Sequence, residues 1–259
     1  MKTSFKTIAK ISFSFLLTLI LILPLKTSAQ GQEGVIDFEH KINMHKTMGS
    51  ENPQMKSMIP EFRTNKNRLF FKPSESFYTN VEEEEQDINA SHDGANVQIK
   101  MNRPQMDMYR NLDNTTFVTL TDFAGKKFRI EDSLKTSAWK FIDETKKIVG
   151  YDCKKATFHN EDNKQDIVAW YTEALVCSSG PQNYWGLPGL ILGVDINDGL
   201  QVITAQKVTL SDVSKDMKVP TGGKKVTAKE FKKIKDEYMK EMGIKDGGAG
   251  GTRIIIRNN

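Results

Sequence analysis

Short segments in which apolar and polar side chains alternate recur along most of this chain, and they constrain its fold more than any other feature. The first begins at Val35, and its members on one face are Ile36, Phe38, His40, Ile42 and Met44. Successive side chains of a β-strand point to opposite faces of a sheet, so this period of two predicts a half-buried strand.

Further apolar or alternating runs follow, separated by residues that favour turns. They cover residues 68–71, 76–79, 97–101, 106–109, 117–121, 127–131, 154–159, 166–172, 190–196 and 200–210. Asn197-Asp198-Gly199 separates the last two and predicts a hairpin, because these residues tolerate positive φ. The pattern predicts a mainly β fold, in the form of a strongly curved antiparallel sheet or half-barrel of about ten short strands.

The spacing changes to that of a helix after Pro220. Thr227 and Glu230 have the spacing of a capping box, and the apolar residues that follow at helical intervals are Phe231, Ile234, Tyr238 and Met242. We therefore expect an amphipathic helix over 228–242 that packs on the sheet. Its lysine-rich outer face is interpreted as solvated, because acidic residues are interleaved; contact with an anionic membrane is the alternative.

The first 29 residues have the composition of a secretory signal peptide. They contain four lysines, no acidic residue, an apolar run over 11–25, and a small-residue end at Thr27-Ser28-Ala29. Cleavage near Ala29 predicts a periplasmic or secreted protein without a transmembrane segment. The whole chain has 37 Lys and Arg against 33 Asp and Glu. Loss of the four lysines makes the charge neutral, which excludes a strongly basic nucleic-acid binder.

These patterns divide the chain into four parts. The signal peptide takes 1–29 and the antiparallel β domain 30–219. The amphipathic helix on the sheet takes 220–245, and 246–259 is a Gly-rich tail with an isoleucine-rich terminal strand over 254–256.

The chain has two cysteines, Cys153 and Cys177, on either side of a predicted hairpin over 154–174. Export places them in an oxidising compartment, and facing strands could bring their Cβ atoms to the usual bridging distance of about 3.8 Å. A disulfide is one prediction, and two free buried thiols are the alternative.

Methionine and histidine side chains gather near the first predicted strand, and they offer a weak candidate metal site: His40, Met44, His45 and Met48. Thioether sulfur and imidazole suit copper. Alternatively, Met44 continues the apolar alternation, and methionine commonly fills gaps in a core. No cofactor is predicted.

Motifs for catalysis are missing from the sequence. It has no G-x-S-x-G elbow, no H-E-x-x-H pair and no phosphate-binding glycine loop between a strand and a helix. Asp143 and Glu144 are adjacent, so on a strand they would point to opposite faces and make a poor acid/base pair. We therefore name no catalytic residue and expect a protein that is not an enzyme.

The segment 178–193 contains several glycines and two prolines, which predict a shaped turn. Its candidate ligand or partner surface consists of Tyr184, Trp185, Leu187, Pro188 and Leu190. The alternative is that Tyr184 and Trp185 seal one end of the core. The residues assigned to a structural motif are Gly186, Pro188, Gly189, Trp170 and Tyr171.

Four motifs in order resemble the GLPGLI family of exported bacterial proteins. In chain order they are DETKKIVGYDCKKA over 143–156, AWYT over 169–172, SGP over 179–181 and GLPGLI over 186–191. Gly193 stands where such proteins often carry an acidic residue. The resemblance implies a β-rich periplasmic protein without an established activity, and by fold analogy a curved sheet like that of the LolA lipoprotein carrier.

Together these observations favour a non-enzymatic, exported envelope protein that binds an apolar small molecule or lipid-like group on a curved sheet. A surface-mediated interaction or assembly factor for envelope proteins, acting near Trp185 and 254–256, is the alternative. Copper binding is a third, weaker alternative.

Overall fold

The computed structural model describes residues 32–47, 56, 59–81, 88–92, 95–99 and 105–242. Its main sheet contains β1 (Gly34–Asn43), β2 (Phe62–Phe71), β3 (Glu75–Asn80), β6 (Met106–Asn111), β7 (Thr116–Phe123), β8 (Lys126–Ser133), β9 (Lys140–Ile148), β10 (Tyr151–Asn160), β11 (Gln165–Thr172), β12 (Leu190–Ile196), β13 (Gln201–Leu210) and β14 (Lys224–Val226). The remaining elements are the strands β4 (Ile88–His92) and β5 (Ala95–Ile99) and the helices α1 (Met44–Thr47) and α3 (Ala228–Glu241).

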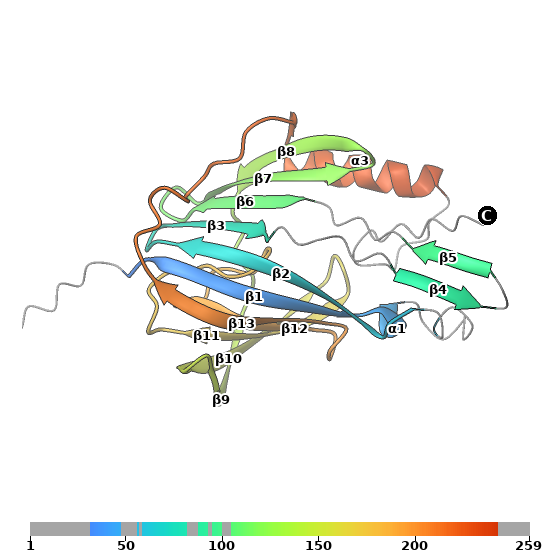
Figure 1. Ribbon diagram of the computed structural model, residues 1–259. Coiled ribbons are helices and arrows are strands. Elements are labelled where there is room, and N and C mark those ends of the chain that lie inside the picture. The colour runs from blue at the N-terminus through green and yellow to red at the C-terminus, as the bar shows by residue number, and fades with distance from the viewer. Residues whose placement is uncertain are drawn as a thin grey trace, which may run out of the picture. The chain divides into compact units, whose positions relative to one another are not determined.

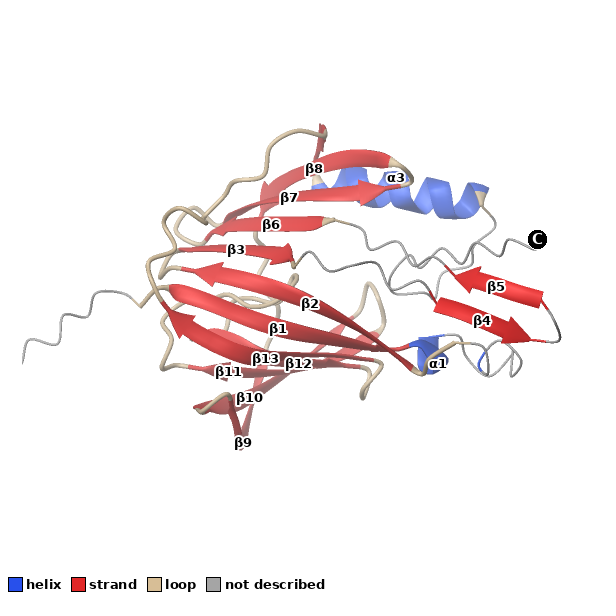
Figure 2. Cartoon of the chain, viewed as in Figure 1, coloured by secondary structure: helices blue, strands red, loops and turns tan. Residues whose placement is uncertain are grey.

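The twelve strands form one curved, unclosed sheet in the order β14-β8-β7-β6-β3-β2-β1-β13-β12-β11-β10-β9 (Figure 1). Neighbouring strands are antiparallel, except that β14 runs parallel to β8. β4 and β5 pair only with each other. The predicted mainly β fold is confirmed, and strands dominate the chain in Figure 2.

Strand β1 joins two arms of the sheet, because it pairs with β2 on one side and with β13 on the other. Short turns connect most neighbours within each arm. The predicted hairpin turn between β12 and β13 is confirmed: Asn197, Asp198 and Gly199 have φ values of 50°, 50° and 78°.

One face of the sheet carries the hydrophobic core, and we call it the core face. Ile36, Leu69 and Ile203, from three adjacent strands, each have an exposed fraction of 0%. Residues 173–189, which connect β11 to β12, add Leu175 and Leu187 to the same cluster at 0% and 1% exposure. We call this connection the plug segment, because it covers the core face with the chain's own side chains.

The C-terminal helix is confirmed close to its predicted limits. Its N-cap is Thr227, whose hydroxyl accepts a hydrogen bond from the Glu230 amide at 3.2 Å, while the Glu230 carboxylate accepts one from the Thr227 amide at 2.7 Å. Met242 is the C-cap. Phe231 and Ile234 pack against the buried cluster of Phe128, Ile130 and Val226.

Other predicted parts lie outside the described residues: the signal peptide over 1–29, the tail over 246–259 and Met48. The domain limits drawn from the sequence therefore stay predictions. Among the helices that the structure describes, none has the length and apolar character needed to cross a membrane.

The predicted disulfide is wrong, because Cys153 and Cys177 are both free, buried thiols. Lys154 at the start of β10 pairs with Tyr171 near the end of β11, so the strand register places Cys153 beside the end of the hairpin. Cys177 follows several residues later, inside the plug segment. Burial raises the pKa of the Cys153 thiol to about 11 and that of the Cys177 thiol to about 12.

Candidate functional site

A groove of about 270 Å³ lies between the tip of the β7–β8 hairpin and the C-terminal half of α3. Its lining combines aromatic and apolar side chains with charged ones. Its lining residues are Phe123, Ala124, Lys126, Phe128, Ile234, Glu237, Tyr238 and Glu241.

The β7–β8 side of the groove is fixed by a two-residue turn. Ala124 and Gly125 have φ values of 51° and 77°, the left-handed conformation that suits a tight hairpin. Phe123 and Lys126 are direct partners across this turn, so their side chains lie on the same face of the sheet. Residue Phe128, further along β8, is 4% exposed and closes the floor.

The α3 side of the groove is held by aromatic contacts. The ring of Phe123 meets Tyr238 edge-on at 5.2 Å between centroids and Phe231 at 5.8 Å. Phe231 also contacts Phe128 at 5.3 Å. Ring pairs at these separations favour edge-to-face geometry and add to the free energy of burial. The groove is therefore built on side chains whose orientation is set by packing.

Strand β14 and the N-terminus of α3 anchor the helix to β8. The amide of Ala228 donates to the Asp132 carboxylate at 3.1 Å, and Lys225 forms an ion pair with Glu131. Hydrogen bonds from the Ser133 and Ala228 amides lower the pKa of Asp132. The hydrogen bond from Lys225 likewise lowers the pKa of Glu131. Both carboxylates thus remain ionised and bonded at neutral pH.

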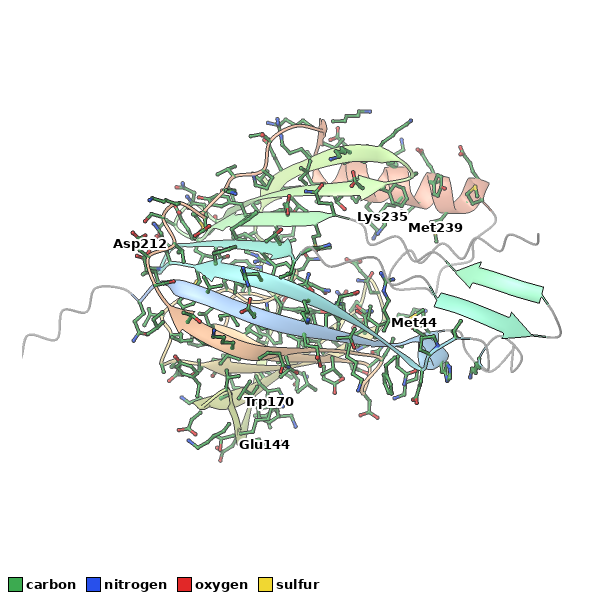
Figure 3. The ribbon with its side chains drawn as sticks, in the orientation of Figure 1. Met44, Glu144, Trp170, Asp212, Lys235 and Met239 are labelled. Atoms are coloured by element: carbon green, nitrogen blue, oxygen red, sulfur yellow. The ribbon has the colours of Figure 1, made fainter. Side chains whose placement is uncertain are left out.

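The polar rim supplies both donors and acceptors. Glu237 and Glu241 are one helical turn apart and so share a side of α3, while Lys126 approaches from the hairpin. The carboxylate of Glu237 lies 3.8 Å from the ammonium of Lys233, which precedes it by one turn of α3. Both side chains are exposed, so the carboxylate stays accessible to solvent. Figure 3 shows Lys235 and Met239 on the same helix. Such a site suits a ligand that offers both C–H faces and hydroxyl groups.

Tyr184 and Trp185, from the predicted ligand surface, lie away from this groove in the plug segment. Tyr184 packs against the core, and burial raises its pKa to about 12. The Trp185 indole donates to the Lys135 carbonyl at 3.1 Å, and the Trp185 carbonyl accepts from the Trp139 indole at 3.0 Å. These bonds fix Trp185 in place, and its role toward a partner stays a prediction.

The other predicted surface residues have contrasting positions. Leu187 and Leu190 are 1% and 0% exposed, whereas Pro188 is exposed. Gly186 and Gly189 have φ values of 87° and 148°. A Cβ atom on Gly189 would lie 2.0 Å from the Thr172 carbonyl oxygen, so this position requires glycine.

Trp170 and Tyr171 point to opposite faces of β11. Tyr171 is buried at 3% exposure. The Lys146 ammonium lies 4.2 Å from the centre of the Trp170 ring, a cation–π contact. Trp170 and Glu144 are labelled in Figure 3, and Glu144 accepts a hydrogen bond from Lys155 at 2.9 Å.

The predicted metal ligands make contacts with protein groups. His40 contacts the Gln201 side chain through Nε2 at 3.0 Å and the Gln182 amide through Nδ1 at 3.4 Å. His45 Nε2 contacts the Ile59 carbonyl at 3.1 Å, and Met44 is buried at 3% exposure. Within the described ranges, no group of three or more His, Cys, Asp and Glu side chains is placed to hold a metal ion.

Two crystal structures of PNGF-II, in space groups P21 and C2, are similar to this chain. They align with TM-scores of 0.54 and 0.51 and identities of 19% and 17%, so the likeness is one of fold. Each covers 79% of this chain, which spans only 33% and 32% of the two PNGF-II chains. No match was found among curated proteins.

A family model described as "N-glycanase peptide, N-terminal domain" matches residues 73–227, more than half of the chain. This match corrects the resemblance to the GLPGLI family and to the LolA carrier, which rested on short motifs and on a strand pattern that many folds share. It also overturns the expected function of binding an apolar small molecule or lipid-like group. The core face that would have held an apolar ligand is filled by the plug segment. The chain belongs to the N-glycanase peptide, N-terminal domain family.

Proposed function

We propose that this protein is a glycan-recognition domain that binds N-glycosylated peptides in the groove between β7–β8 and α3. The observation that carries the proposal is that groove, in which packed aromatic rings and exposed carboxylates line one ligand-sized space. Family membership supports the choice of ligand, because the family is named for an N-glycanase. The matched residues contain the β7–β8 half of the groove and end at Thr227, the N-cap of α3.

The chemistry of the groove fits a sugar ring. One face of a pyranose presents C–H groups, which pack on the rings of Phe123 and Tyr238. Its hydroxyl groups donate to Glu237 and Glu241, and hydrogen bonds to charged acceptors are the stronger kind. The Lys126 ammonium donates to ring or hydroxyl oxygens from the opposite wall.

The size of the groove limits what it holds. At about 270 Å³ it lies just below the usual range of ligand pockets, which is roughly 300–1,000 Å³. We therefore assign it a short segment of a glycan rather than a whole branched chain. Few hydrogen bonds and an open groove give a dissociation constant between about 10 μM and 1 mM.

The arrangement favours binding without bond cleavage. Hydrolysis of a glycosidic bond by two carboxylates requires groups that approach the bond from different directions. Glu237 and Glu241 instead project from the same side of one helix, one turn apart. We assign both to hydrogen bonding with hydroxyl groups.

Export of the protein is part of the same proposal. A basic, acid-free segment followed by the apolar run over 11–25 supports translocation. Glycosylated peptides that the domain could meet would then be outside the cytoplasm. Mass analysis of protein recovered from culture medium and periplasm, with cleavage found near Ala29, would test this part separately.

Isothermal titration with a high-mannose N-glycopeptide tests the proposed function, and the same peptide without its glycan serves as the ligand control. We expect the glycopeptide to bind and the bare peptide not to bind. Phe123→Ala and Glu241→Gln should each weaken binding by about 10-fold, the loss of one ring contact or one charged hydrogen bond. Phe141→Ala is the matched protein control, because Phe141 is an exposed aromatic on β9 with 61% exposure.

Equal affinity of wild-type protein for glycosylated and bare peptide would refute glycan recognition. Equal losses in Phe123→Ala and Phe141→Ala would refute the groove as the site. Thermal unfolding of each variant separates loss of binding from loss of structure.

A further inference from the structure

Arg110 is a fully buried cation at the junction of β6 and the plug segment. Its exposed fraction is 1%, and it lies on the core face opposite Ser76. Its Nη1 atom donates to Ser179 Oγ and to the Gly180 carbonyl, both at 3.3 Å. Both acceptors are neutral, and both bonds are slightly longer than the usual N–H···O range of about 2.7–3.2 Å.

The other terminal nitrogen of this guanidinium, Nη2, is buried without a hydrogen-bond partner. The Tyr78 hydroxyl, also buried, is likewise without one. Tyr78 pairs with Met108 across β3 and β6, so Tyr78 and Arg110 are diagonal neighbours on the same face. Long side chains reach each other at that spacing. Two buried donors, for which the described residues supply no acceptor, therefore lie on the same face of two neighbouring strands.

Within the part of the chain that the structure describes, the groups that shift the pKa of Arg110 include no carboxylate. Burial lowers its pKa to about 10, so it remains protonated at neutral pH, and the titratable groups that act on it are Cys177 and Tyr78. Burial raises the pKa of Cys177 to about 12 and raises that of Tyr78 as well, so both are neutral. A buried cation without a counter-charge is strongly unfavourable.

We propose that Arg110 Nη2 and the Tyr78 hydroxyl hold a monatomic anion, such as chloride, which neutralises the guanidinium beside the plug segment. The ligand must accept two hydrogen bonds and carry a negative charge. It must also be small, because Tyr78 and Cys177 belong to a packed core cluster.

The bound anion fastens the plug segment to β6. Ser179, which accepts from Arg110, also contacts Ser76 Oγ at 2.7 Å, and its carbonyl accepts from the Ile191 amide at 2.9 Å. Neutralising Arg110 stabilises this set of contacts between β3, β6, the plug segment and β12. This site is independent of the groove and of the proposed glycan binding.

Thermal unfolding of the purified full chain in sodium gluconate, chloride and bromide at equal ionic strength tests the proposal. Because an anion that binds only the folded state raises the midpoint, we expect a midpoint that rises and saturates with chloride and bromide but not with gluconate. Tyr78→Phe removes one donor with little change in volume and should weaken halide affinity by about 10- to 100-fold. Tyr109→Phe, on the same sheet, should keep the wild-type response.

Crystals grown in bromide should show anomalous density between Arg110 Nη2 and Tyr78 Oη. Equal midpoints in gluconate and halide salts would overturn the proposal, as would equal halide responses of wild-type protein and Tyr78→Phe. A water molecule at that position in bromide-grown crystals would also overturn it. Arg110→Met should abolish halide dependence, and Tyr78→Phe keeps the test decisive if that variant does not fold.

Discussion

Phe231 makes a large contribution to the docking of α3, and replacing it by alanine should release the helix while the sheet stays folded. No residue of α3 is fully buried, so its 14 residues are held by the half-buried Phe231, Ile234 and Tyr238. An isolated helix of this length is marginally stable in water. Helix order therefore reports the free energy of docking.

The magnitude follows from the contacts that the substitution removes. A core Phe→Ala change costs about 3–5 kcal/mol, and a half-buried ring loses roughly half of that. Phe231 also makes ring contacts with Phe123 and Phe128 at 5.8 and 5.3 Å. Such pairs contribute about 0.5–1.5 kcal/mol each. We expect a loss of about 3 kcal/mol, which corresponds to roughly a 100-fold increase in the population of undocked helix.

Amide hydrogen exchange resolved by residue measures this effect directly. Amides in the middle of α3 should exchange about 100-fold faster in Phe231→Ala, while those of β1 and β13 keep their protection. Phe141→Ala should change neither region, since Phe141 is 61% exposed. Unchanged exchange in α3, or equal loss of protection in α3 and β1, would refute the argument that Phe231 holds the helix independently of the sheet.

Four further substitutions or conditions have defined outcomes. Thr227→Ala should cost α3 about 1 kcal/mol, seen as faster exchange of its first turn; unchanged exchange would contradict the capping box. The Thr227 amide lowers the pKa of Glu230, so this carboxylate stabilises the helix above the ordinary Glu pKa and loses that effect as the pH falls through the lowered value, which acid titration of α3 exchange can follow. Gly189→Ala should lower the melting temperature severely, because its Cβ would clash with a carbonyl of β11 and its φ is 148°; a melting temperature within a few degrees of wild type would argue against this backbone. Cys153 and Cys177 should be alkylated only after unfolding and should titrate as two thiols, whereas a mass deficit of about two protons would indicate a disulfide.

The strand pattern could be predicted from the sequence where one face is buried. The alternation of β1 and the continuous apolar run of β12 both predicted strands correctly. In each strand, the pattern of apolar residues matches the pattern of burial. β9 was not predicted, because eight of its nine residues are exposed and leave no apolar face to recognise. β14 has three residues and is specified by its parallel pairing with β8, which the local sequence does not encode.

The groove could be predicted only in part. Helical spacing identified Phe231, Ile234 and Tyr238 as one face of a helix, and the break between the apolar runs 117–121 and 127–131 indicated a turn. Neither signal says that the tip of the β7–β8 hairpin lies against that face, since this contact depends on the pairing of β14 with β8. The disulfide prediction failed for a related reason: the length of the plug segment, not the hairpin register, determines where Cys177 lies.

Chemical-shift mapping of the ¹⁵N-labelled protein with a high-mannose N-glycopeptide tests the glycan-recognition proposal most directly. The expected result is a saturable set of shifts at Phe123, Lys126, Tyr238 and Glu241, absent with the bare peptide. Shifts confined to other surfaces, or no shifts with glycopeptide at millimolar concentration, would contradict binding in the groove.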